Sequence, residues 1–284
     1  MWFLLSFGSA FFDSIKDVFA KKSIVKIDEY AAAWSQRFFS LIILVPLMLT
    51  HLPAALDRAF WQAMAIIIVL ATIASICYMK SLKYSPLSVV LPIASLTPMF
   101  ILLTSKLINH ELPILFGIIG VCVAVVGAYV LQWSKRAQGF FSPLTHLFTD
   151  KGSRYMLAVA LLWSITSPYD KIAIQHSNPY FYVGIAGVIY TLILFPFMLK
   201  KSRLRSVFAN LTAQAPIGLG QGVAVLLQML AVPLTFVAYV TAVKRSSSIF
   251  GPLWGKLFFQ EEKLVERTIG TIIILIGIIL MILS

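Results

Sequence analysis

Long apolar runs alternate with short polar links along almost the whole chain. Ten of these runs reach the length of a membrane-spanning helix, about 20 residues. They lie near residues 2–20, 30–50, 60–79, 85–108, 113–132, 154–174, 180–199, 213–232, 234–259 and 265–283. The links are short except for a polar, turn-rich segment at residues 133–153. The pattern predicts an all-α integral membrane protein with ten transmembrane helices.

The second half of the chain repeats the first at an offset of 150 residues. Alignment without a gap superposes charged, proline and glycine residues: Lys21 on Lys171, Pro46 on Pro196, Lys106 on Lys256, Glu111 on Glu261, Gly120 on Gly270 and Gly127 on Gly277. Only 12% of the residues are charged, so charged matches in register are hard to obtain by chance. Because a repeat of five spans is odd, the second copy must cross the membrane in the opposite direction. The sequence predicts two inverted five-helix repeats, residues 1–132 and 154–284, joined by the loop at 133–153.

Composition excludes a large soluble domain. The 284 residues are 60% hydrophobic with a mean hydropathy of +0.90, and ten spans use about 200 of them. In a soluble protein, a net charge of +12 would suggest nucleic acid as a partner. In a membrane protein, basic residues are instead concentrated in the links on the cytoplasmic side of the membrane. We therefore expect the lipid bilayer and a small-molecule substrate as partners, and no nucleic acid.

The basic residues are distributed very unevenly between the two sets of links. Counted together with the span ends beside them, the links after odd-numbered spans carry 16 Lys and Arg, and those after even-numbered spans carry three. The positive-inside rule then places the odd links in the cytoplasm and both termini outside. We expect a multi-pass protein of a bacterial inner (plasma) membrane. Labelling of a cysteine at Ser284 by an impermeant reagent in intact cells tests this orientation.

Several motifs resemble a known family. The run Ala242-Val243-Lys244-Arg245-Ser246, the run from Gly255 to Glu261, and Gly270 with Gly277 resemble the second half of EamA-type members of the drug/metabolite transporter superfamily. In the first half, the matching residues are Tyr84-Ser85-Pro86-Leu87, Glu111, Gly120 and Gly127. The resemblance covers the whole chain and implies a ten-helix, two-repeat secondary carrier of small metabolites. It also implies cytoplasmic termini, against the charge bias, and it names no substrate.

Four basic residues, Lys16, Arg37, Lys244 and Arg245, lie well inside predicted spans. A charge inside the membrane costs several kcal/mol. A basic residue in a span therefore has a function, forms an ion pair, or extends its long side chain to the membrane surface. We expect Lys244 or Arg245 to hold an anionic group of the solute, with Arg37 helping from the other repeat. Neighbours in a helix point about 100° apart, so we expect only one of Lys244 and Arg245 to face the cavity. Further expected lining residues, from spans one, two, four, six, seven and nine, include Trp34, Ser95, Trp163 and Ser248.

The acidic counterpart lies in the first span. Asp13, Lys16 and Asp17 have the i, i+3, i+4 spacing of one helix face. Asp13 or Asp17 can carry a coupling proton if its site is dry, or Lys16 can neutralise one of them permanently. Asp170, beside Lys171 at the end of the sixth span, is expected to be interfacial and structural.

The charges Lys106, Glu111, Lys256 and Glu261 are expected to be structural. In each repeat, a lysine ends one span and a glutamate precedes the next, which complements the dipoles of the two helices across a tight turn. No catalytic or solute-binding role is needed to explain them.

The leading interpretation is a secondary transporter of a small polar, anion-bearing metabolite such as an amino acid, an organic acid or a phosphorylated metabolite. An exporter or flippase of an amphiphilic or lipid-linked anion is the alternative within the same class. A membrane-embedded enzyme is the rival class. However, the chain has no HExxH or GxSxG motif, and His51, His110, His146 and His176 are scattered. We expect no enzyme activity, no cofactor and no metal; the lack of a P-loop leaves an ion gradient or a partner as energy source. The oligomeric state stays open.

Overall fold

The structure is a computed structural model that describes residues 1–23, 27–85, 87–133, 149–247, 250 and 265–284. Within these ranges, all regular secondary structure is helical. In the first half the helices are α1 (Trp2–Ser23), α2 (Glu29–Thr50), α3 (Arg58–Tyr84), α4 (Leu87–Ala94), α5 (Thr97–Ile108) and α6 (Leu115–Trp133). In the second half they are α8 (Lys151–Gln175), α9 (Pro179–Leu194), α10 (Lys201–Ala209), α11 (Leu211–Ala231), α12 (Val237–Lys244) and α14 (Val265–Ile282). Short 3-10 turns, η1 (Phe195–Met198) and η2 (Val232–Leu234), extend α9 and α11.

Many of these helices are apolar and long enough to cross a bilayer. Five stretches of the described chain meet this description by length and composition, and two shorter apolar helices accompany them: Glu29–Thr50, Arg58–Tyr84, Val89–Ile108, Pro179–Met198 and Leu211–Leu234, with Leu115–Val130 and Ile269–Ile282. The helices α1 and α8 are also long, at 22 and 25 residues. They are less apolar because they carry polar side chains that are buried inside the bundle. The chain is therefore an all-α, multi-pass membrane protein.

Side-chain caps explain where several helices begin. Asp28, Asp57, Asp150 and Asn178 each accept a hydrogen bond from a backbone N–H in the first turn of α2, α3, α8 and α9, respectively, at 2.7 to 2.9 Å. Such a cap satisfies an N–H group that has no partner within the helix. These starts lie one to three residues before the start of the corresponding apolar run. The basic helix α10 was not predicted, because it has no apolar run.

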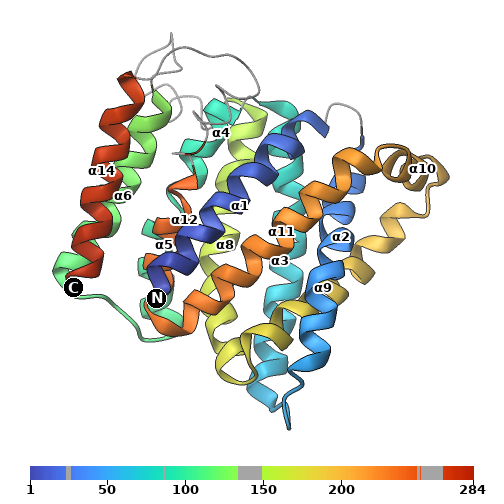
Figure 1. The fold of residues 1–284 in the computed structure, drawn as a ribbon, viewed down its shortest axis with the longest axis horizontal. Coiled ribbons are helices and arrows are strands. Elements are labelled where there is room, and N and C mark those ends of the chain that lie inside the picture. Colours follow the sequence, from blue (N-terminus) through green and yellow to red (C-terminus); the bar gives the residue numbers. More distant parts are fainter. Residues whose placement is uncertain (24–26, 86, 134–148, 248–249, 251–264) are drawn as a thin grey trace.

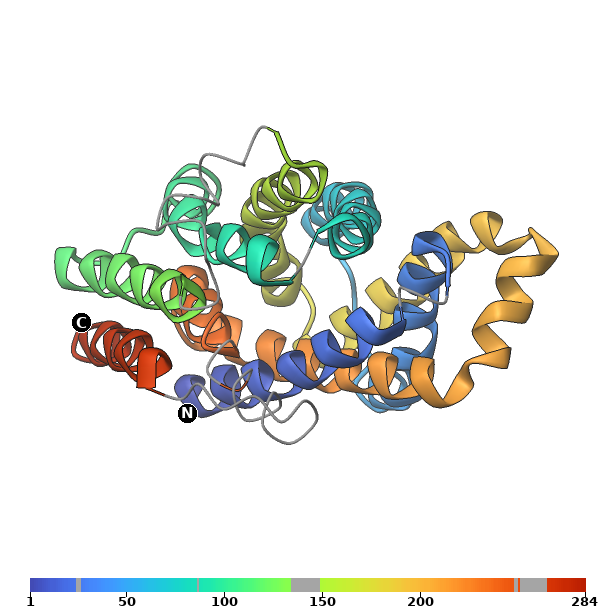
Figure 2. The same ribbon diagram turned by 90° about the horizontal axis from the view of Figure 1, so that it is seen from above.

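The helices pack in two layers with a pair at one edge. In Figure 2, α1 and α11 form one layer and α3, α5 and α8 the other. Along the layers, α1 packs on α11 and α3 packs on α8, while α2 packs on α9. The pair α6 and α14 lies side by side at one edge of the bundle (Figure 1). Helices of the two halves of the chain are thus in contact throughout.

Glycines bring α6 and α14 into close contact. A Cβ atom added at Gly127 would lie 2.6 Å from the backbone nitrogen of Ile274, and one added at Gly277 would lie 2.5 Å from that of Ala124. Gly120 faces Gly277 in the same way, 2.8 Å from its carbonyl oxygen. Small residues allow this approach, which favours helix association in a bilayer where no hydrophobic force acts between helices.

Substitution of Gly127 by alanine is expected to destabilise the protein by about 1–3 kcal/mol, because backbone must move to make room. The measurement is thermal unfolding of the purified protein in detergent. Gly220→Ala in α11 is the matched control, since its nearest neighbour would be the Cβ of Lys16 at 3.6 Å. Equal stability of the two variants would contradict the assigned contact.

Candidate functional site

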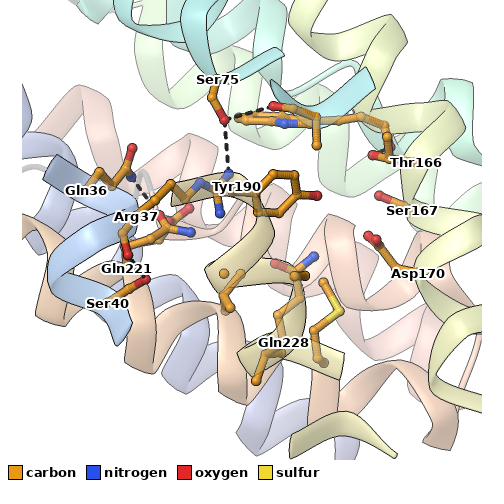
Figure 3. Close-up of a pocket in the computed structure, with 18 of the residues that line it drawn as sticks. Gln36, Arg37, Ser40, Ser75, Thr166, Ser167, Asp170, Tyr190, Gln221 and Gln228 are labelled. Carbon is orange, nitrogen blue, oxygen red and sulfur yellow. Dashed lines mark hydrogen bonds between the residues drawn. The ribbon is translucent and has the colours of Figure 1, made fainter. Parts of the chain in front are cut away.

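A polar cavity lies between the two layers of helices (Figure 3). Its empty volume, with the part that is open to solvent included, is about 1100 Å³. Helices of both halves contribute to its wall: α1, α2, α3 and α5 from the first, and α8, α9, α11 and α12 from the second. The polar and charged residues of the wall are Asp13, Lys16, Gln36, Arg37, Ser40, Ser75, Tyr78, Thr97, Thr166, Ser167, Asp170, Tyr182, Tyr190, Gln221, Gln228, Thr241, Lys244 and Arg245.

A helix break between α4 and α5 supplies one of these residues. Pro98 has no N–H to donate to the carbonyl oxygen of Ala94, four residues earlier. The hydroxyl of Thr97 donates to that oxygen instead, at 2.6 Å. The same hydroxyl oxygen accepts a hydrogen bond from Nη2 of Arg245 at 3.3 Å. The proline break therefore links the first half of the chain to a buried cation of the second half.

Lys244 and Arg245 lie where α12 ends. The backbone N–H of Arg245 still bonds to the carbonyl oxygens of Thr241 and Ala242, at 3.0 and 3.2 Å. The last carbonyl groups of a helix carry partial negative charge, which stabilises cations nearby. The two side chains both line the cavity, so the expectation that only one faces it is wrong. Arg245 keeps helical backbone angles (φ −67°, ψ −13°), so the two long side chains reach the same cavity although they leave the helix in different directions.

The charges of α1 form a cluster with residues of neighbouring helices. The Lys16 ammonium lies 2.6 Å from Oδ1 of Asp13 and 3.2 Å from Oδ1 of Asp17. Oδ2 of Asp13 also lies 3.5 Å from Nζ of Lys244, which donates to Gln228 at 2.7 Å. These contacts fit the alternative in which Lys16 neutralises a carboxylate. A proton-carrying role of Asp13 or Asp17 stays a prediction.

Two aromatic residues complete the wall beside this cluster. The Tyr78 hydroxyl donates to Oδ1 of Asp17 at 2.6 Å. The guanidinium of Arg245 lies over the Trp163 ring, 5.1 Å from its centroid. Trp163 thus lines the cavity, and its place in the solute pathway stays a prediction. Ring faces attract cations most strongly where water is excluded.

Arg37 has no carboxylate partner within 4.0 Å among the described residues, unlike Lys16, Lys171 and Lys244. Its Nη2 donates to the Ser75 hydroxyl at 3.1 Å, and its guanidinium lies over the Tyr190 ring, 4.7 Å from the centroid. Its Nε is buried and has no hydrogen-bond partner. Beside it, Gln36 donates to Gln221 at 2.8 Å and joins α2 to α11. Arg37 thus offers an unused N–H group next to the cavity.

Asp170 lies in the wall of the cavity and is buried inside the bundle. It is 8% exposed and accepts a short hydrogen bond from the Tyr182 hydroxyl. Its sequence neighbour Lys171 points elsewhere, because its Nζ lies 2.8 Å from Oε2 of Glu111. Burial in the cavity wall does not fit the expectation of an interfacial, structural carboxylate. Adjacent residues of α8 face different neighbours, and the sequence does not show which face meets the cavity.

Trp34 and Ser95 lie outside the main cavity. Trp34 is buried between α2 and α9, where its indole N–H donates to the Thr191 carbonyl oxygen at 3.2 Å. Ser95 donates to the Leu91 carbonyl oxygen at 3.0 Å and lines a smaller cavity on the far side of the α1 charges. Trp34 is not among the residues that line the main cavity, and its place in the solute pathway stays a prediction. Ser248 lies outside the described residues.

Of the four charged residues expected at the turns between spans, the structure describes the two of the first half, Lys106 and Glu111. Glu111 pairs with Lys171 of α8, so it joins the two halves of the chain in addition to preceding α6. Lys106 is exposed in the last turn of α5. The equivalent residues Lys256 and Glu261 lie outside the described ranges. The structural role assigned to these residues stays a prediction.

Sequence reasoning missed the contribution of α3 and α11 to the cavity. Ser75 and Tyr78 come from α3, and Gln221 and Gln228 come from α11. Buried amides in an apolar run were the available signal, because Gln221 and Gln228 are seven residues apart and so lie on one helix face. The 150-residue offset in the sequence pairs Tyr78 with Gln228, and both residues line the cavity.

Known proteins resemble the chain in sequence and in fold. The EamA-like transporter family matches residues 1–133 and 150–283. An uncharacterized transporter from Archaeoglobus fulgidus is 23% identical over 285 residues, which cover 99% of this chain and 97% of that protein. A protein of known crystal structure has the same fold with a TM-score of 0.71 at 15% identity, over 99% of this chain and 96% of that one.

Proposed function

Because the chain belongs to the EamA-like transporter family, we propose that it is a secondary active transporter that moves a small polar, anion-bearing metabolite by alternating access. Membrane transport is the activity of the family. The chemical class of the solute is inferred from the cavity. The observation that carries this inference is Arg37, a buried cation in the cavity wall without a carboxylate within 4.0 Å in the described part of the chain.

An unpaired buried guanidinium is costly, and a ligand that supplies a negative charge removes that cost. Breaking a buried ion pair costs about 3–5 kcal/mol. A carboxylate or phosphate of the solute would remove this cost by pairing with Arg37, since the planar guanidinium presents parallel N–H groups to two oxygens, and the net gain is what remains after the solute loses its own hydration. Lys244 and Arg245 add positive charge to the same cavity. An organic acid, an amino acid or a phosphorylated metabolite meets this requirement.

The proposed architecture is ten transmembrane helices in two inverted repeats, residues 1–132 and 154–284. Helix bounds in the described residues support it, because α4 spans Leu87–Ala94 and α12 spans Val237–Lys244, an offset of 150 at both ends. The starts of α2 and α9, and of α6 and α14, differ by the same number. The two segments matched by the family divide the chain at nearly the same place.

Alternating access follows from this architecture. A cavity at the interface of two inverted repeats can open to one side when the halves tilt one way and to the other side when they tilt back. The cavity walls come from both halves, and the breaks next to Thr97 and Arg245 are positions at which short helices can change angle. The energy for solute accumulation must come from an ion gradient. We propose that the ion is a proton.

Uptake by purified protein in liposomes tests this function. A panel of organic acids, amino acids and phosphorylated metabolites is offered with and without an imposed pH gradient. We expect accumulation of one anion-bearing class above protein-free liposomes, and greater accumulation with the gradient. Movement of amphiphilic or lipid-linked anions alone would favour the flippase alternative, and movement of cations alone would contradict the proposal. The proposed location is a bacterial inner membrane.

A further inference from the structure

Two buried charges of opposite sign face the cavity without an ion-pair partner in the described structure. They are Arg37 of α2 and Asp170 of α8, which belong to different halves of the chain. In Figure 3 they approach the cavity from opposite sides, with Tyr190 drawn between them. Three other charged side chains of the main cavity wall, Asp13, Lys16 and Lys244, each lie within 4.0 Å of an opposite charge.

Among the described residues, the Asp170 carboxylate has a hydrogen-bond donor but no cation within ion-pair distance. One oxygen, Oδ1, accepts the hydrogen bond from the Tyr182 hydroxyl. Among the described residues, Oδ2 has neither a hydrogen bond nor a cation within 4.0 Å. The positive charges that act on this carboxylate from a distance are those of Arg37 and Lys244. Asp170 can therefore accept further N–H donors from a group inside the cavity.

We propose that Arg37 and Asp170 together bind a small zwitterion, with Arg37 holding its carboxylate and Asp170 its ammonium group. This inference rests on the proposed function and narrows the solute to the α-amino acid class. The ammonium group supplies three N–H donors, which the Asp170 carboxylate can accept. Each charge of the solute then replaces water with a fixed partner of opposite sign.

A simple anion fits the same cavity less well. It would neutralise Arg37, but it would leave Asp170 unpaired and would be repelled by it across a medium of low dielectric constant. A simple cation has the converse problem with Arg37. The zwitterion is the class that satisfies both buried groups at once.

The rest of the wall suits a side chain that is at least partly apolar. Leu44, Val183, Val225 and Met229 line the same cavity from α2, α9 and α11. Pockets of this kind use a few placed polar groups for orientation and apolar walls for the remainder of the ligand. The side-chain amide of Gln36 donates a hydrogen bond to the amide oxygen of Gln221.

Binding to the purified wild-type protein is measured for the twenty common amino acids by the shift in unfolding temperature. The best ligand is then compared with its deaminated acid and its decarboxylated amine, for example leucine with 4-methylpentanoate and 3-methylbutylamine. We expect both truncated compounds to bind at least tenfold more weakly than the amino acid. Absence of binding by all amino acids, or equal binding of the deaminated acid, would overturn the inference.

Asp170→Asn tests the residue assignment, because asparagine keeps the shape and an acceptor for Tyr182. We expect the amino acid to lose at least tenfold in affinity and to bind no better than its deaminated acid. Asp57→Asn, the same change at an exposed helix cap, should leave this discrimination intact. Unchanged discrimination in Asp170→Asn would overturn the assignment.

The outcomes separate this inference from the broader proposal. A simple carboxylate that binds as tightly as the amino acid, and whose binding is lost in Arg37→Gln, overturns the zwitterion while anion transport stands. Ligand binding that is insensitive to Arg37→Gln overturns both.

Discussion

Replacement of Arg37 by glutamine is expected to reduce uptake by about 100-fold or more, while the protein still inserts and folds. Loss of one partner of a buried charged contact costs about 2–5 kcal/mol, and each 1.4 kcal/mol is about tenfold in binding. Glutamine keeps a hydrogen bond to Ser75 possible but removes the charge. Initial rates in liposomes at several solute concentrations measure the effect.

Two further variants make the Arg37 result specific. Arg37→Lys keeps the charge but loses the planar pair of N–H groups, so it should restore only part of the activity. Arg58→Gln removes the same charge from an exposed position in the first turn of α3 and should transport normally. Normal transport by Arg37→Gln, at unchanged protein levels, would exclude Arg37 from the solute site.

Replacement of Asp13 by asparagine is expected to give the largest loss of stability, about 3–5 kcal/mol. Asp13 is the carboxylate that lies near both Lys16 and Lys244, at 2.6 and 3.5 Å. Its loss leaves Lys244 buried without a carboxylate within 4.0 Å in the described residues, while Lys16 keeps Asp17. Thermal unfolding and the yield of monodisperse protein in detergent measure the loss.

A second substitution distinguishes a structural Asp13 from a proton carrier. Addition of Lys244→Met to Asp13→Asn removes the uncompensated cation, so most of the stability should return, since such a pair is coupled. The exposed change Asp57→Asn is the control for the loss of a carboxylate. If Asp13→Asn were as stable as the wild type but lost the response to a pH gradient, Asp13 would be the coupling residue instead.

Helix positions and buried charges could be predicted from the sequence because each depends on local information. An apolar run of about 20 residues crosses a bilayer as a helix whatever surrounds it. The expected run at 30–50 corresponds to α2 at Glu29–Thr50, and the run at 85–108 corresponds to α4 and α5 with their proline break. Lys16, Arg37, Lys244 and Arg245 stood out in the sequence for the same reason, because charge within such a run is rare.

The partners of those charges depend on how the helices are rotated and where they stop. Helical periodicity places Asp13, Lys16 and Asp17 on one face of a helix. It does not show which neighbouring helix that face contacts. Lys244 reaches Asp13 only because α12 ends beside α1.

The sequence by itself determined the all-α membrane class and the positions of the long apolar helices, whereas the 150-residue repeat and its inversion stay predictions. Local hydropathy is sufficient for the class and the helix positions. Only the tertiary structure decided that Trp34 packs between α2 and α9, that Glu111 pairs with Lys171, and that Asp170 faces the cavity with Arg37. These contacts join residues 60 to 157 positions apart. They depend on how packed helices are rotated relative to one another and on where each helix ends, and neither can be read from the periodicity of the sequence.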